Sequence, residues 1–307
     1  MIGKIAIFCK NFLDWFKSER CFLYPFIKAF PFANNLLLVT LALCFATFNI
    51  IYFALSLQIK VNILVITLVL ALLSSAFVAG FCQIIKDTVD ANEEDKDVHR
   101  LDIKHAFVSF YSGVGKKYLS YLCGFILFFS IIILSMMASL LLATKYICPL
   151  SSIGLDLDSL QLVLSNQNAM LEFASQMTKS QVIKMLELFY ITNVITPGII
   201  GFLLMLWTPE FVYTGKNVVV ALFTSIKKLF LDFWNVVCIY LVIAFGHILI
   251  ALVFGLFPQM SLISYIGSLV FIYWLIYNIF VLFIYYRKKW CVEETVIPAE
   301  KAAEEQE

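Results

Sequence analysis

Charged residues are scarce in this sequence. Asp, Glu, Lys and Arg make up 14% of its 307 residues, whereas hydrophobic residues make up 62%. An ordinary soluble domain is about 25% charged, so this composition excludes a soluble globular protein and also a disordered chain. The charges nearly cancel, with 22 basic and 21 acidic side chains. We therefore expect no nucleic-acid partner.

Recognisable catalytic and metal-binding signatures are also missing. The eight cysteines stand singly, without a C-x-x-C pair or a Cys/His spacing that would hold zinc. There is no H-E-x-x-H, no G-x-S-x-G and no glycine-rich phosphate loop. The acidic run over 87–97 lacks the glycine and the alternating spacing of a calcium loop. We therefore expect a protein without enzymatic activity, cofactor or metal.

Long apolar runs are what the sequence does contain. About 20 apolar residues in a helix cross the ~30 Å hydrocarbon core of a bilayer. The runs are continuous rather than alternating, which favours helices over a membrane barrel. The sequence thus predicts an all-α, polytopic membrane helical bundle, with amphipathic interfacial helices beside six transmembrane helices at about 35–57, 61–85, 119–147, 189–213, 233–257 and 263–286.

Three regions follow from this assignment. Residues 1–33 are predicted to form a cytoplasmic amphipathic helix that lies on the membrane surface. Residues 34–286 form the six-span membrane domain, which includes an external helical loop at 148–188. Residues 287–307 form an acidic cytoplasmic tail.

The distribution of Lys and Arg predicts the orientation. Eighteen of the 22 lie on the side that holds both termini, and four lie on the other side: Lys60, Lys145, Lys179 and Lys184. Positive charge marks the cytoplasmic side of a membrane protein. We expect a multi-pass protein of the cell (inner, cytoplasmic) membrane with both termini in the cytoplasm.

Two segments between spans are amphipathic at helical spacing. In 103–116 one face carries Ile103, Phe107, Phe110, Tyr111 and Val114; in 216–231 one face carries Val219, Leu222, Phe223, Ile226 and Phe230. Ala106 and Ala221 open similar stretches in these two segments. This pattern suggests a parallel internal repeat of the form span, interfacial helix, span, as in some transporters. The alternative, that any two such hairpins look alike, is equally open.

Several stretches carry a resemblance to known families. They are SERCFLYPFIKAFPF ahead of the first span, FVAGFCQIIKD at the end of the second, and WTPEFVYTGKNVVVALFTSIKKLFLDFW before the last pair. The chain resembles bacterial six-helix membrane families known as domains of unknown function. It is also similar to the membrane domain that accompanies some glycerophosphodiester phosphodiesterases, in which Pro209 and the Ala221–Ser225 stretch would match characteristic positions. The catalytic domain of those enzymes is absent, so the resemblance implies no activity.

Two polar residues within the spans are candidate functional residues. An ionisable group near the centre of a span costs about 2.5–3.5 kcal/mol, and His247 is the most central one. It can be a simple hydrogen-bonding residue between helices or a group linked to protons or substrate. Asn278 in the last span can hydrogen-bond across helices, typically for about 1 kcal/mol or less.

Two acidic residues at span ends complete the candidate set. Glu210 and Asp232 are expected at the cytoplasmic interface, near Lys216, Lys227 and Lys228 in the sequence. Pairing with these lysines would anchor the interface; a functional site is the other interpretation.

Three function classes remain, of which an intramembrane enzyme has no motif to support it and the other two stay open. The first is handling or transport of a small solute or lipid. The alternative is a non-catalytic membrane scaffold or partner subunit that docks through its cytoplasmic amphipathic helices. The lipid bilayer is the one expected partner; a second copy of the chain or an unidentified protein is the further possibility.

Overall fold

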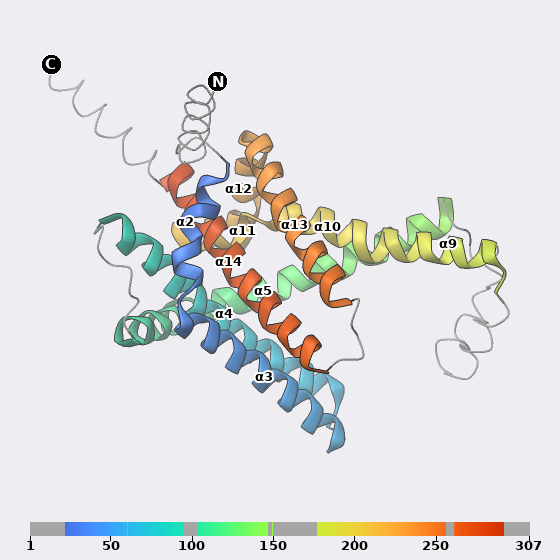
Figure 1. Cartoon of the computed structure of the whole chain (residues 1–307), viewed down its shortest axis with the longest axis horizontal. Coiled ribbons are helices and arrows are strands. Elements are labelled where there is room, and N and C mark those ends of the chain that lie inside the picture. The colour runs from blue at the N-terminus through green and yellow to red at the C-terminus, as the bar shows by residue number, and fades with distance from the viewer. Residues whose placement is uncertain are drawn as a thin grey trace, which may run out of the picture. The chain divides into compact units, whose positions relative to one another are not determined.

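A computed structural model describes residues 22–59, 61–94, 103–146, 149, 177–255 and 261–291. Of these residues 93% are helical and none is in a strand, which confirms the all-α class. The elements (Figure 1) are α2 Tyr24–Ala33, α3 Leu36–Gln58, α4 Ile63–Glu94, α5 Ile103–Tyr146, α9 Lys179–Tyr190, η1 Ile191–Ile195, α10 Thr196–Leu204, α11 Trp207–Thr214, α12 Val218–Leu231, α13 Phe233–Gly255, α14 Ser261–Tyr286 and η2 Arg287–Cys291.

Six helical segments of the described residues are long and apolar enough to cross a membrane. They match the six predicted spans one for one, although the fourth begins at Lys179 rather than at 189, and cover Leu36–Ser56, Val65–Ala91, Lys117–Tyr146, Lys179–Thr214, Phe233–Gly255 and Tyr265–Cys291. The chain is therefore a multi-pass membrane protein by length and composition of its helices.

Several predicted features lie outside the described residues. They are the N-terminal part of the amphipathic helix expected over 1–33, most of the external loop at 148–188, and the acidic tail beyond Cys291.

The chain divides into two compact units. The first unit comprises residues 1–125 and 204–307; the second comprises 126–203. The long helix α5 contributes its first half to the first unit and its second half to the second.

In the first unit, α2 packs along the C-terminal half of α14 (Figure 1). The Tyr277 hydroxyl donates to the Phe26 carbonyl at 2.7 Å, and the rings of Phe32 and Phe280 stack with centroids 5.6 Å apart. The Lys288 ammonium lies 3.8 Å from the ring centroid of Tyr24. Residues 24–33 of the expected 1–33 helix thus bury one face against the last span.

Close helix approaches in the first unit depend on glycine. A Cβ placed on Gly80 would lie 2.4 Å from the ring of Phe110, and one on Gly113 would lie 2.5 Å from the Ala79 carbonyl oxygen. Because glycine has no Cβ, the backbones of α4 and α5 can approach closely at this crossing. In the same way Gly246 of α13 makes room for the Trp274 ring of α14.

The helix that contains the third predicted span begins well before the span. The amphipathic stretch 103–116 and the span 119–147 form one continuous helix, α5. The junction contains Gly113 and Gly115 but no proline, so nothing there removes a backbone donor. By contrast α12 and α13 are separate, since Asp232 leaves the helical conformation with φ −123° and ψ 42°. In the suggested repeat, the interfacial helix and the following span are thus continuous in the first half and separate in the second.

The fourth predicted span, 189–213, is interrupted. Its first part passes through the π-helical turn η1, where the Thr196 N–H donates to the Ile191 carbonyl five residues earlier. Pro197 follows directly and has no N–H of its own, so a regular α-helical bond cannot form there. Wider π turns occur at such interruptions, frequently at functional sites.

Candidate functional site

The helical hairpin of α11 and α12 builds the first candidate site. Gly215 takes the left-handed conformation, with φ 63°, and donates its N–H to the Phe211 carbonyl to end α11. The Asn217 side chain accepts from the Val219 N–H and begins α12. A buried bond from the Trp207 indole N–H to the Val218 carbonyl, 3.0 Å long, joins the two helices.

A buried ion pair joins the two helices of this hairpin, and hydrogen bonds to Tyr286 connect the pair to α14. Glu210 of α11 is 0% exposed, and one of its oxygens lies 2.9 Å from the Lys228 ammonium of α12, which is 12% exposed. The same oxygen accepts a hydrogen bond from the Tyr286 hydroxyl, and Lys228 in turn donates to that hydroxyl at 2.6 Å. Three elements thus meet at one carboxylate.

Aromatic rings surround the pair. The Lys228 ammonium lies 4.8 Å from the ring centroid of Tyr286 and 5.3 Å from that of Trp290. Tyr213 stacks on Tyr286 with ring centroids 5.6 Å apart. Such contacts stabilise a partly desolvated ammonium electrostatically.

The second oxygen of Glu210 is less well satisfied. It has no hydrogen-bond partner among the described residues, and the Lys216 ammonium lies 3.8 Å away. Lys216 is 47% exposed, so it can reach water as well as the carboxylate. The site therefore combines one buried anion with two cations of different exposure.

Asp232 belongs to a neighbouring set of bonds. One of its oxygens accepts from the Tyr285 hydroxyl at 2.6 Å, and the other accepts from the Asn235 amide at 2.8 Å. Arg287 forms an ion pair with Asp90 of α4 at 2.9 Å. The expected lysine pairing thus occurs at Glu210, whereas Asp232 accepts hydrogen bonds from a tyrosine and an asparagine.

Within the described part of the chain, His247 and Asn278 form no hydrogen bond with the cluster around Glu210. The Nδ1 atom of His247 lies 2.8 Å from the Ile243 carbonyl oxygen one turn earlier, and its ring packs edge-on against Phe271 and Trp274. Asn278 is buried, and neither amide atom has a hydrogen-bond partner among the described residues. The geometry of His247 is that of a side chain satisfied within its own helix.

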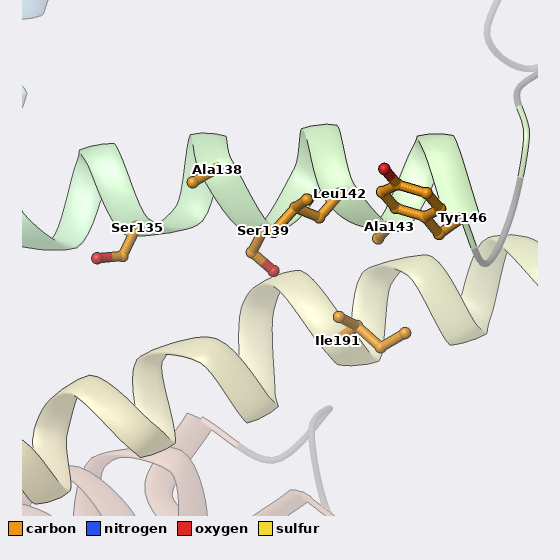
Figure 2. Close-up of a pocket in the computed structure, with 7 residues that line it drawn as sticks. All are labelled: Ser135, Ala138, Ser139, Leu142, Ala143, Tyr146 and Ile191. Atoms are coloured by element: carbon orange, nitrogen blue, oxygen red, sulfur yellow. The ribbon is translucent and has the colours of Figure 1, made fainter.

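The second unit contains an open groove beside the π turn (Figure 2). Its volume is about 580 Å³, and its lining combines small and apolar side chains with three hydroxyls: Ser135, Ala138, Ser139, Leu142, Ala143, Tyr146 and Ile191. Figure 2 shows Ser139 directed from α5 toward the helix that carries Ile191. The Thr196 hydroxyl donates its one hydrogen to the Ile191 carbonyl at 2.9 Å. The Ser139 hydroxyl, 2.6 Å from the Thr196 oxygen, therefore donates to it and keeps its lone pairs as acceptors.

In the sequence, Ser135 and Ser139 are small residues four apart, a spacing that permits close helix packing. Their place in a groove depends on how the facing helix packs against α5, which this spacing does not predict. Tyr286 was not a candidate either; it is the last residue of the predicted span 263–286, where several tyrosines stand among apolar residues.

The described residues offer no group of three His, Cys, Asp or Glu side chains that could hold a metal ion. Comparison of the chain with protein-family models, with curated proteins and with solved structures finds no match. The function therefore has to be inferred from the residues of this chain.

Proposed function

We propose that this protein handles a lipid, or a solute with a similar apolar chain, at the groove between α5 and η1. The groove is the observation that carries the proposal. Its volume of about 580 Å³ falls within the ~300–1,000 Å³ of small-molecule sites. Both helices that form it belong to membrane-spanning segments, so an acyl chain can reach it from the bilayer.

The chemistry of the lining supports an amphiphilic ligand. Carbon atoms dominate the surface, and the hydroxyls of Ser135, Ser139 and Tyr146 supply a few polar contacts. A site that is mostly apolar with a few placed hydrogen-bonding groups binds an apolar chain and orients a polar group attached to it. The bound molecule is carried or presented without a chemical step.

We further propose that the protein lies in the cytoplasmic membrane with both termini inside. The 18 to 4 distribution of Lys and Arg between the two sides supports this orientation.

Two matched leucine substitutions on α5 test the groove. Ser135→Leu fills space inside it, whereas Ser130→Leu makes the same change at an exposed position whose hydroxyl bonds to the Ile126 carbonyl of its own helix. The purified proteins are photolabelled with a phospholipid that carries a diazirine in its acyl chain. We expect wild type and Ser130→Leu to be labelled over residues 135–146, and Ser135→Leu to lose most of this labelling. Equal labelling of the two variants would refute the proposal.

A scaffold is the second candidate, because the first half of α5 exposes an apolar surface. Phe107, Val108 and Tyr111 lie on it together with Ser112 and Gly115. If a partner protein docks there, it should no longer copurify with the Phe107→Ser and Tyr111→Ser variants. It should still copurify with the Ser135→Leu variant. The reverse pattern, with lipid lost at Ser135→Leu and no protein affected, favours lipid handling.

A further inference from the structure

The helix α12 presents three different faces. One is buried in the first unit and comprises Val218, Ala221, Leu222, Ser225 and Leu229. At 100° per residue a second face lies about a third of a turn away and exposes Val219, Phe223 and Phe230, with Phe223 69% exposed. Lys227 lies exposed beyond this second face. Beyond Lys227 the helix also exposes Val220 and Leu231, at 51% and 65%. The exposed surface of α12 is thus broadly apolar, with one lysine within it.

The two adjacent lysines of α12 have different surroundings. Lys228 points inward and pairs with the buried Glu210. Lys227 is exposed, and so is Lys216 at the start of the hairpin. One exposed lysine of α12 therefore lies next to the exposed rings, and a second exposed lysine precedes the helix.

The position of α12 in the first unit is fixed by its buried contacts. The Glu210 pair holds its C-terminal half, and the bond from Trp207 holds its first residue. Trp234, directly after α12 at the beginning of the span α13, is 77% exposed. Exposed tryptophan at the end of a span is typical of the boundary between headgroups and acyl chains.

We propose that the exposed face of α12 binds an anionic membrane surface. Val219, Phe223 and Phe230 lie among the upper acyl chains, and Lys227 and Lys216 bind the headgroup phosphates. In contact with water alone, the apolar side chains of this face would stay unfavourably exposed. Fully immersed in hydrocarbon, the face would carry the charged Lys227 into the membrane. The headgroup boundary satisfies both, because a lysine stem can lie along apolar surface while its ammonium reaches the phosphates.

This surface belongs to the first unit and the groove to the second, so either proposal can fail without the other. The orientation proposed above makes the leaflet the cytoplasmic one, which carries anionic lipids.

Photo-crosslinking from α12 tests the proposal. The full chain, with Phe223 replaced by benzoylphenylalanine, is reconstituted into vesicles of equal phosphatidylcholine and phosphatidylglycerol. A second variant carries the same replacement at Phe230, in case the first does not fold. We expect lipid adducts, enriched in phosphatidylglycerol about fivefold for each contacting lysine. Lys227→Gln lowers this enrichment about fivefold, and the control Lys179→Gln, at the exposed beginning of α9, leaves it unchanged.

Three results would overturn the proposal. One is the formation of adducts with protein only, from a second copy of the chain or from another protein. Another is equal yield of the two lipid adducts in the wild-type background. The third is an equal loss of enrichment in Lys227→Gln and Lys179→Gln.

Discussion

Replacing Lys228 by glutamine is expected to destabilise the protein far more than replacing its neighbour Lys227. Glu210 is 0% exposed, and Lys228 is the cation 2.9 Å from its oxygen. Removal of one partner of a buried ion pair typically costs about 3–5 kcal/mol, because the other charge stays buried without compensation. Lys216 remains 3.8 Å from the second oxygen, so we expect about 3 kcal/mol, near the lower end.

The reciprocal change, Glu210→Gln, is expected to be milder. It leaves the Lys228 ammonium, which is 12% exposed, donates to the Tyr286 hydroxyl and lies over two aromatic rings. These contacts and the residual access to water offset part of the loss, so we expect about 1–3 kcal/mol. We therefore expect Lys228→Gln to lower the free energy of unfolding more than Glu210→Gln does.

A double-mutant cycle over Glu210→Gln and Lys228→Gln measures the coupling. The free energy of unfolding is obtained by SDS titration of the purified protein in mild detergent, with Lys227→Gln as the matched control. We expect a coupling energy at the upper end of the usual ~0.5–3 kcal/mol for residues in contact, and a control within about 0.5 kcal/mol of wild type. A Lys228→Gln variant as stable as the control would show that the buried pair does not hold the hairpin.

Further outcomes follow from other contacts. Tyr286→Phe removes a hydroxyl that both donates and accepts within the buried cluster, and should lower the free energy of unfolding by about 1–3 kcal/mol in the same titration. Gly246→Ala places a Cβ 2.1 Å from the Trp274 ring and should cost about 1–3 kcal/mol, whereas Gly255→Ala, which meets nothing within 4 Å, should be neutral. His247→Leu should change stability by less than about 1 kcal/mol, because its bond is local; a larger loss would mean that the imidazole bridges helices.

The spans could be predicted from the sequence because a run of about 20 apolar residues has few alternatives in a bilayer. Interruptions within the helices could not be predicted equally well. The amphipathic stretch 103–116 and the span 119–147 were predicted as separate elements but form one helix, and the π turn at Ile191–Ile195 was not predicted. Such details depend on the helices packed alongside, which periodicity does not describe.

The candidate site was predicted only in part. Glu210 and its neighbouring lysines were recognised because charges at span ends stand out. The choice of Lys228 over Lys227 was not predictable, since it depends on which way each side chain points from α12. Tyr286 lies 76 residues from Glu210 in the chain, and a pattern in one span carries no information on such a contact. His247 was singled out for its central position, but its bond to Ile243 lies within its own helix.

The number of membrane crossings is the central claim, since the groove and the α12 surface both depend on it. Reporter fusions in the native membrane test it most directly. Six crossings with cytoplasmic termini predict an external signal after Lys60 and near Gln167, and a cytoplasmic signal near Glu94 and Glu307. A cytoplasmic signal at Gln167 would contradict the six-span account.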